Sequence, residues 1–330
     1  MTAADRARLR PADLPDRSAA MLATLTDDRF SDPRWIFERK LDGVRCLARR
    51  DADGRVTLRS RNDLDMTATY PEVAVALADA CDTDAVVDGE IVAFDGRRTS
   101  FGTLQGRIGI SDPDVALASG IPVFFYVYDL LHLAGHDVRP VPQLARKHLL
   151  RSALTWDDPL RYTVHRREAG EAMYARACER GDEGVIAKRA DAPYSGGRSR
   201  DWLKFKCVRD QEFVVGGWTD PKGSRADLGA LLVGYHDGDT FAYAGKVGTG
   251  FDQATLRDLA GRLRPLAAEA SPFGRSPATV RRERDVHWVR PELVVQIGFA
   301  EWTRDGLLRH PRYQGLRTDK AAVDVVRETG

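Results

Sequence analysis

Lysine is scarce in this chain and arginine is abundant. Of its 50 basic residues 8 are lysines and 42 are arginines, and Lys40 opens the run Lys40-Leu41-Asp42-Gly43-Val44-Arg45. A guanidinium stays protonated at any working pH, whereas an ammonium can be tuned to lose its proton. A lysine retained in so arginine-rich a chain is therefore a candidate nucleophile. The first hypothesis is an enzyme that forms a covalent bond through Lys40.

The segment from Trp202 to Lys206 alternates between apolar and basic residues. In a strand this pattern projects Lys204 and Lys206 to one face and directs Leu203 and Phe205 into the core. Two like charges on one face repel each other unless an anion lies between them, which predicts a phosphate ligand.

Two carboxylates accompany these lysines. Glu183 precedes an apolar strand that ends at Lys188, and Asp88-Gly89-Glu90 opens another buried strand. Carboxylates beside a phosphate predict Mg²⁺, a hard cation that prefers oxygen ligands. Each segment alone also fits a solvated strand edge, and their occurrence in one chain favours a site.

The composition sets the class of protein. The chain has 330 residues, of which 43% are hydrophobic and 30% charged, with a net charge of +1. These values predict a globular protein of two domains. No apolar stretch approaches the ~20 residues of a membrane helix, and residues 1–17 lack the apolar region of a secretory signal.

The four cysteines are scattered without a Cys-x-x-Cys pair, at Cys46, Cys81, Cys178 and Cys207. This spacing predicts reduced intracellular thiols and neither a disulfide framework nor a zinc site.

Patterning divides the chain into a polar leader (1–17), a catalytic domain (18–208) and a C-terminal domain (209–330). Strands are expected over 35–48, with a break at 42–43, and over 55–61, 85–94 and 123–131; helices are expected over 71–80, 143–154 and 168–180. Beyond residue 210, short strands and one helix (252–266) predict a small barrel of OB type. Arginines crowd 161–167, 275–290 and 304–317, either as solvated surface or as a phosphate-binding track.

Taken together, the motifs resemble those of the ATP-dependent DNA ligases, which are covalent nucleotidyltransferases, and most closely the ligase module of the bacterial ligase D group. The similarity runs from about residue 21 to 320. The matching segments are 40–45, Ser60-Arg61-Asn62, 88–90, Phe125-Tyr126-Val127-Tyr128-Asp129, 183–188, 202–206 and 308–320. The resemblance implies an α+β fold, with an adenylation domain of antiparallel sheets and helices followed by a C-terminal OB-fold barrel.

By the same resemblance, Lys40 would attack the α-phosphate of ATP, form lysyl-AMP and release pyrophosphate, with Asp42 beside it. Glu38 is expected near the adenine and Arg45 on the ribose side. Tyr128 is expected to stack on the adenine, where the family usually has phenylalanine, a change that keeps the aromatic face and adds a hydroxyl.

The resemblance also assigns the metal and phosphate contacts. Glu90, also on the ribose side, and Glu183 are expected to bind Mg²⁺, for which Mn²⁺ can substitute, and Asp42 is a further candidate ligand. Lys204 and Lys206 are expected to bind the AMP phosphate, with Arg198 nearby. Arg61 is expected to contact a phosphate, either of the nucleotide or of the nick. Because these cations surround Lys40, they should favour its uncharged amine.

The C-terminal motif supplies Arg317, Asp319 and Lys320. The resemblance implies that these residues approach with the OB domain to orient the pyrophosphate, and withdraw to admit DNA. AMP then passes to the 5′-phosphate of a nick, and a 3′-hydroxyl displaces it. Binding through phosphates should be independent of sequence and sensitive to salt.

The expected partner is nicked or broken duplex DNA, handled by a monomer in the bacterial cytoplasm at the nucleoid, in repair and recombination. No separate DNA-encircling domain is expected before its motifs. Ku and separately encoded polymerase or nuclease proteins are expected partners by family analogy.

Two alternatives stay open. RNA ligases and capping-type nucleotidyltransferases share the lysine motif, but the segment from Arg317 to Lys320 favours a DNA ligase. A non-catalytic nick-binding clamp is the second alternative. The presence of all five central residues argues against it: Lys40, Glu90, Glu183, Lys204 and Lys206.

Overall fold

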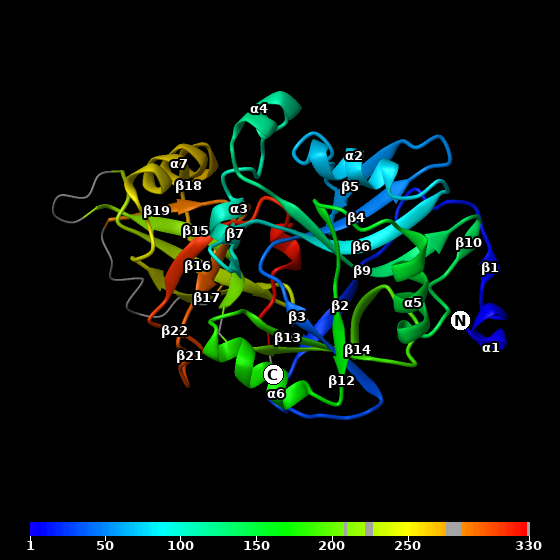
Figure 1. Cartoon of the computed structure of the whole chain (residues 1–330). Coiled ribbons are helices and arrows are strands. Elements are labelled where there is room, and N and C mark those ends of the chain that lie inside the picture. The colour runs from blue at the N-terminus through cyan, green and yellow to red at the C-terminus, as the bar shows by residue number, and fades with distance from the viewer. Residues whose placement is uncertain (208–209, 222–226, 275–284, 329–330) are drawn as a thin grey trace. The chain divides into compact units, whose positions relative to one another are not determined.

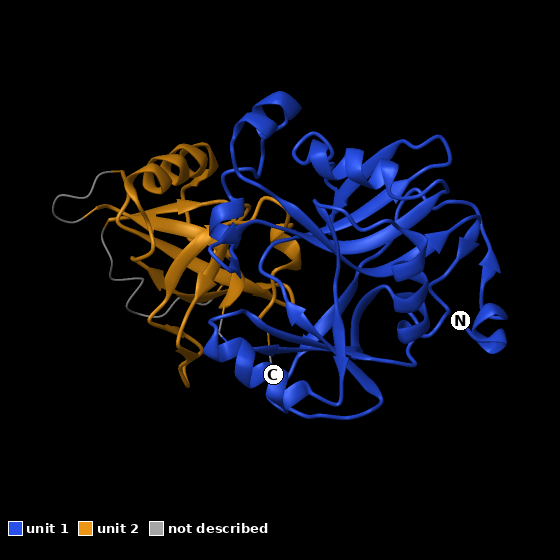
Figure 2. Ribbon diagram, viewed as in Figure 1, with its two compact units in different colours: residues 1–207, 330 blue, residues 208–329 orange. Residues whose placement is uncertain are grey.

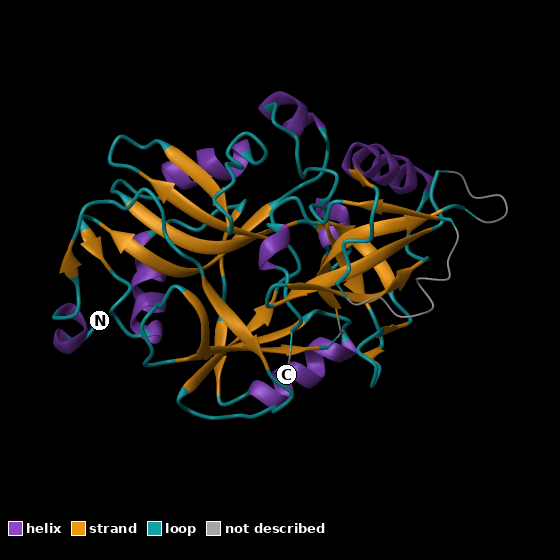
Figure 3. Cartoon of the chain, turned by 180° about the vertical axis from the view of Figure 1, so that it is seen from behind, coloured by secondary structure: helices purple, strands orange, loops and turns teal. Residues whose placement is uncertain are grey.

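The computed structural model describes residues 1–207, 210–221, 227–274 and 285–328 (Figure 1). The chain divides into two compact units, residues 1–207 with residue 330, and residues 208–329 (Figure 2). The sequence analysis predicted this boundary between residues 208 and 209, one residue later. Strands in mostly antiparallel sheets dominate both units, as the predicted α+β class requires, and the helices lie outside them (Figure 3). Among the described residues, no helix has the length and apolar character needed to cross a membrane.

The larger sheet of the first unit has the order β1-β10-β9-β6-β4-β5, with β11 parallel to β9. Its strands are β1 (Arg10–Pro11), β4 (Val44–Arg50), β5 (Val56–Ser60), β6 (Ala85–Val92), β9 (Phe124–Leu133), β10 (His136–Asp137) and β11 (Leu160–Tyr162). One face packs into an apolar core with α2 (Pro71–Asp79) and α5 (Gln143–Ala153). On β4 this face carries Val44, Cys46 and Ala48. The alternate residues Arg45, Leu47 and Arg49 therefore lie on the opposite face.

The second sheet of this unit has the order β12-β3-β13-β14-β2. Its strands are β2 (Met21–Leu25), β3 (Trp35–Lys40), β12 (His165–Arg167), β13 (Gly184–Arg189) and β14 (Gly197–Lys206). Helix α6 (Gly170–Glu179) packs on one face, where Phe37, Val185 and Ala187 are buried with Leu203 and Phe205. The predicted inward direction of Leu203 and Phe205 is confirmed. The opposite face is free for polar side chains.

Short elements complete the first unit: α1 (Ala3–Arg6), β7 (Phe94–Asp95), β8 (Arg98–Thr99), α3 (Phe101–Leu104) and α4 (Pro113–Ala118). Residues 1–17, expected to form a loose leader, instead carry α1 and β1, and β1 pairs with β10. A two-residue strand has no periodicity that sequence could reveal, because its pairing depends on a partner more than a hundred residues away.

The expectation of four reduced thiols is wrong for two of them. Cys178 and Cys207 form a disulfide, with their Cα atoms 5.1 Å apart, whereas Cys46 and Cys81 are free. Cys178 lies on α6 and Cys207 directly follows β14. The packing of α6 against this sheet brings the two together, and their separation of 29 residues carries no sign of it.

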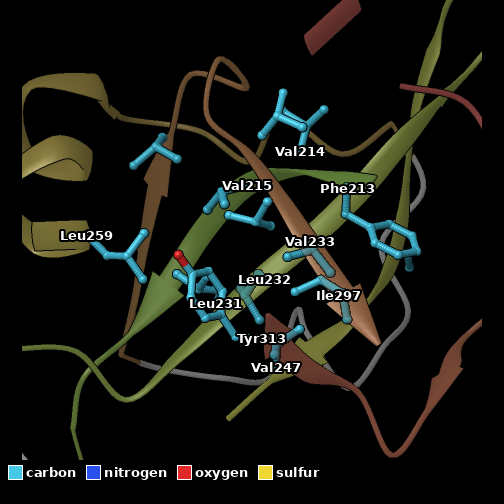
Figure 4. Packing of buried hydrophobic residues seen from close by; sticks show 14 of the residues in the cluster. Phe213, Val214, Val215, Leu231, Leu232, Val233, Val247, Leu259, Ile297 and Tyr313 are labelled. Atoms are coloured by element: carbon cyan, nitrogen blue, oxygen red, sulfur yellow. The ribbon is translucent and has the colours of Figure 1, made fainter. Parts of the chain in front are cut away.

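The second unit is a strongly bent sheet of order β17-β16-β15-β19-β18, in which β20 pairs with both β15 and β23. Its elements are β15 (Asp210–Thr219), β16 (Ala230–Asp237), β17 (Thr240–Val247), α7 (Gln253–Leu263), η1 (Arg264–Leu266), β18 (Ala267–Ala268), β19 (Val286–Val289), β20 (Val294–Gly298), β21 (Glu301–Trp302), β22 (Leu308–Arg309), β23 (Arg312–Leu316) and η2 (Ala322–Asp324). Phe213, Leu231, Val233 and Ile297 form part of its apolar core, against which Leu259 of α7 packs (Figure 4). Most of the arginine tract 275–290 lies outside the described residues.

Candidate active site

Strand register places the predicted lysines on one face of the second sheet. Lys40 on β3 lies opposite Gly184 on β13, and Gly184 lies opposite Lys206 on β14. In the next row, Glu38, Ile186 and Lys204 are aligned in the same way. Directly opposed residues share a face of a sheet. Lys40, Lys204 and Lys206 therefore project to the same side, away from α6.

Gly184 lies between the two lysines of the first row for a steric reason. Its φ is +143°, and a Cβ atom there would lie 1.9 Å from the carbonyl oxygen of Phe205. Only glycine fits this position without moving the neighbouring strand. The middle of the row is therefore bare backbone.

The amine of Lys40 contacts the carboxylate of Glu183, the residue directly before β13. The two side chains are 17% and 12% exposed, so the pair is shielded but reachable from solvent. A carboxylate in contact stabilises the charged form of an amine. Lys40 thus has a carboxylate neighbour as well as the cations expected around it, and its role as the nucleophile stays a prediction.

Glu38 occupies a deeper position on the same face. Its two carboxylate oxygens each lie 2.7 Å from an ammonium, those of Lys147 on α5 and Lys188 on β13, and the three side chains are 0–3% exposed. Burial acts to raise the pKa of Glu38, but the two ammonium groups outweigh it and the pKa lies below its usual value. Burial lowers the pKa of Lys147. Because both oxygens of Glu38 are engaged, its contact with adenine stays a prediction.

Arg45 and Tyr128 meet above this network. The Arg45 Nε donates to Asp88 Oδ1 at 2.5 Å, and the hydroxyl of Tyr194 donates to Asp88 Oδ2 at 2.7 Å. The Tyr128 ring centroid lies 5.1 Å from the Arg45 guanidinium and 4.2 Å from the Lys188 amine. Burial raises the pKa of Tyr128, so its hydroxyl stays protonated. The ring is 9% exposed, and stacking on adenine stays a prediction.

Asp42 and Glu90 border the turn that follows Lys40. The Phe101 N–H donates to Asp42 Oδ2 at 2.9 Å, which ties this turn to the start of α3. A Cβ on Gly43 would lie 3.1 Å from the Glu90 Cγ, so Glu90 packs directly against the same turn.

Of the three carboxylates expected at the metal, Asp42 and Glu90 border the turn after Lys40, and Glu183 contacts Lys40 itself. Their binding of a metal stays a prediction. Within the described part of the chain, no group of three or more His, Cys, Asp or Glu side chains is arranged to hold a metal. Mg²⁺ commonly takes one or two protein carboxylates and completes its shell with phosphates and water. Glu183, with Glu90 or Asp42, would hold it in that way.

The two arginines expected at phosphates lie apart from each other. Arg61 follows β5 and lines a cavity on the first sheet. Arg198 lies near the exposed start of β14, where its guanidinium donates to the Ala23 carbonyl at 2.9 Å. A register shift separates it from Lys204 and Lys206. The structure does not bring Arg198 to Lys40, and its nucleotide contact stays a prediction.

The C-terminal motif comes together inside the second unit. Arg317 donates through Nε and Nη2 to the two carboxylate oxygens of Asp319, at 2.9 and 2.8 Å, and both residues are buried. Burial acts to raise the pKa of Asp319, but Arg317 outweighs it and keeps the carboxylate charged. Lys320 lies 3.3 Å from Glu212. Asp319 thus fixes the direction of the Arg317 guanidinium.

Sequence reasoning missed the supporting residues on α5. Arg146 donates to both oxygens of Asp129, at 2.7 and 2.9 Å, and Gln143 accepts a hydrogen bond from the Trp202 indole at 2.9 Å. Gln143, Arg146 and Lys147 recur at helical spacings of three and four. Polar residues on the inward face of a helix are the signal that would have revealed them.

Comparison with known proteins agrees with this geometry. Residues 20–206 match the family described as ATP dependent DNA ligase domain, and residues 224–320 match the ATP dependent DNA ligase C terminal region. The multifunctional non-homologous end joining protein LigD of Pseudomonas aeruginosa is 38% identical over 323 residues, which is 96% of this chain and 37% of that protein. The LigD of Mycobacterium tuberculosis is 37% identical over 319 residues, 95% of this chain and 40% of that protein.

A solved structure is similar over the full fold. The mycobacterial DNA ligase D complexed with ATP and MES is 35% identical, with 94% of this chain and 98% of that chain covered and a TM-score of 0.65. The chain spans about two fifths of the length of the curated LigD relatives. It therefore belongs to the ATP-dependent DNA ligase family, as a ligase module of the LigD type in which a nucleotidyltransferase unit precedes an OB-fold unit.

Proposed function

We propose that this chain is an ATP-dependent DNA ligase that seals breaks in duplex DNA through an AMP group carried on Lys40. The observation that carries the proposal is the arrangement of one lysine in contact with a carboxylate, on the same sheet face as two further lysines. A nucleophile, a proton acceptor and a phosphate-binding pair are the parts that lysine adenylylation requires.

In the first step the ammonium of Lys40 loses a proton, and the neutral amine attacks the α-phosphorus of ATP. A nitrogen–phosphorus bond forms, the bond from phosphorus to the pyrophosphate oxygen breaks, and the nitrogen releases its second proton. Glu183 contacts this nitrogen and would accept a proton from it. Lys204 and Lys206 neutralise the charge that builds on the phosphate oxygens.

Bound Mg²⁺ would supply further positive charge at the phosphates. Arg317, fixed by Asp319, would orient the pyrophosphate, and Lys320 would assist it. Asp42 keeps the turn after Lys40 in place by accepting a hydrogen bond from the first residue of α3. Arg45, held by Asp88, would serve the ribose side.

In the second and third steps, AMP passes to the 5′-phosphate at a break and a 3′-hydroxyl then displaces it. The relatives named for non-homologous end joining support duplex DNA as the substrate and repair as the setting. A Ku-type end-binding protein and separate polymerase or nuclease modules would be partners of this activity. The setting would be the bacterial cytoplasm, at the nucleoid.

The test is the intact mass of the purified chain with and without ATP and Mg²⁺, followed by addition of nicked duplex. We expect a gain of one AMP that disappears as the nick is sealed. Lys40→Ala should gain no AMP and should still bind the nick.

The alternatives have distinct outcomes. Labelling by GTP and not by ATP would favour a capping-type enzyme. Nick binding by the unaltered chain without any covalent AMP would favour a clamp.

A further inference from the structure

A second basic site lies on the first sheet, along β4, the strand that carries Arg45. It is a cavity of about 270 Å³, formed by β4, β5, β6 and residues 15–19. Its lining includes four arginines, Arg17, Arg49, Arg59 and Arg61. Nothing in the adenylylation step uses three of them.

The charge of the cavity is positive after internal pairing. Asp16 and Asp63 are the two acidic residues that line it. Asp63 lies 2.7 Å from Arg17 and 3.6 Å from Arg59, and the side chain of Asp16 is 97% exposed. Asp51 also lies 3.9 Å from Arg49, so four cations face three carboxylates and about one positive charge remains for a ligand.

Two donors in the lining lack a partner. The Nε of Arg49 and the hydroxyl of Ser18 are buried and have no hydrogen-bond partner among the described residues. The terminal nitrogens of Arg49 lie 3.9 and 4.0 Å from Asp51 and Asp16, beyond hydrogen-bond distance. A buried donor left unsatisfied is destabilising, and a ligand with acceptor oxygens would relieve that cost. These donors and the positive charge favour an anionic ligand.

The position of the cavity separates it from the nucleotide. Arg49 lies four residues beyond Arg45 on β4, about 13 Å at ~3.3 Å per residue. Both residues belong to the same face of the sheet, because both alternate with core residues. An anion bound in this cavity would therefore lie on the same face of the sheet as Arg45, but about 13 Å farther along β4.

The rim of the cavity is fixed by a tight turn. Ser60 accepts hydrogen bonds from the N–H groups of Asn62 and Leu64, at 3.3 and 3.1 Å, and Asp63 has a left-handed φ of +65°. Strained backbone of this kind is typical of binding sites. The turn holds Arg61 at the cavity.

We propose that this cavity binds one backbone phosphate of the DNA duplex, at a distance from the phosphate that reacts. The proposal rests on duplex DNA being the substrate. Arg49 and Ser18 are its central donors, and Arg17 and Arg59 supply charge. The contact would hold the duplex in register without reading its sequence.

The experiment measures binding of a nicked duplex by Arg49→Gln across a range of salt concentrations. We expect a Kd about tenfold higher and a slope of log Kd against log salt lower by about one, because one phosphate contact is lost. Adenylylation by ATP alone should be unchanged. Arg151→Gln, an exposed arginine on α5, is the matched control and should alter neither value.

A scan with single methylphosphonate linkages then identifies the phosphate. Neutralising one position should weaken binding to the unaltered chain and leave Arg49→Gln unaffected, as expected for a coupled pair. Ser18→Ala, which leaves the strand intact, should show the same coupling more weakly.

The outcomes are separable. Absence of coupling at every phosphate would overturn the proposal, and a raised KM for ATP in Arg49→Gln would assign the cavity to the nucleotide. If the unaltered chain binds the duplex with this coupling but never seals it, the proposed function fails and the phosphate site stands.

Discussion

Two groups of lysine and glutamate side chains, one around Glu38 and one around Glu183, lie on the same side of one sheet at different depths. Around Glu38, the side chains of Lys147 and Lys188 are at most 1% exposed, and each ammonium approaches its own carboxylate oxygen. Around Glu183, the Lys40 side chain is 17% exposed and lies at the end of β3. The deep contact is enclosed by packing, whereas the shallow one is open to a ligand.

The difference shows that a lysine–glutamate pair can either support the fold or remain accessible to a ligand. A charge removed from water is costly, and the deep network is stable only because every member has a partner. The shallow pair keeps enough access to solvent for a proton to leave and a phosphate to enter. Depth, and not residue type, separates the supporting lysines from Lys40, the proposed nucleophile.

The largest expected effect comes from Lys40→Arg. The guanidinium keeps a positive charge beside Glu183 but cannot lose its proton, so the covalent AMP adduct should fall by about 10³-fold or more. The thermal midpoint should stay nearly constant. Intact mass after incubation with ATP checks the first expectation and calorimetry the second, and an adduct on the arginine variant would contradict both the site and the comparison.

Glu38→Gln, in contrast to Lys40→Arg, should lower the stability of the fold more than it affects adenylylation. The change leaves Lys147 and Lys188 buried without a counter-charge, so the free energy of unfolding should fall by about 3–5 kcal/mol. Urea denaturation measures it. Glu179→Gln, on the exposed end of α6, is the matched control and should change little. Equal stability of the two variants would show that the deep network is not structural.

The deep network should also impose a pH dependence through His165 on β12. Burial, followed by the charge of Lys147, lowers its pKa from 6.5 to about 4. Between these values the unfolded chain binds more protons than the folded one, so stability falls as the pH drops from 6.5 toward 4. With allowance for partial exposure we expect a loss of about 1 kcal/mol. His165→Gln should remove this step from a plot of thermal midpoint against pH; a plot that still contains it would exclude His165 as the cause.

The smallest effect is expected of Tyr128→Phe, a change beside Lys188 of the deep network. Tyr128→Phe keeps the ring between Arg45 and Lys188 and should alter the free energy of unfolding by no more than about 0.5 kcal/mol. Tyr128→Leu removes the cation–π contacts and should cost about 1–2 kcal/mol. A phenylalanine variant as unstable as the leucine variant would show that the hydroxyl, and not the ring, is what matters.

The sequence predicted the local features of this fold, such as helices and strand faces, but few of its long-range contacts. The alternation of 202–206 predicted which side of β14 is buried, and helical periodicity predicted α2, α5 and α7 to within a few residues. The motif order predicted that Lys40 and Glu183 belong to one site, and the structure brings them into contact.

The deep network had no comparable signal. Lys147 is 109 residues from Glu38, and their contact depends on how α5 packs against both sheets. Asp88 was passed over in favour of Glu90, although Asp88 is the residue that holds Arg45. Pairings of this kind arise from tertiary packing, which neither periodicity nor spacing encodes.

The glycine between Lys40 and Lys206 has one further consequence. Because the three residues form a row across β3, β13 and β14, the attachment points of the two amines are two strand spacings apart, or about 9.6 Å. Hydrogen bonding between neighbouring strands sets this distance. The attachment points of Lys40 and Lys206 thus owe their separation to the main chain, and the long, flexible side chains need only span the remainder.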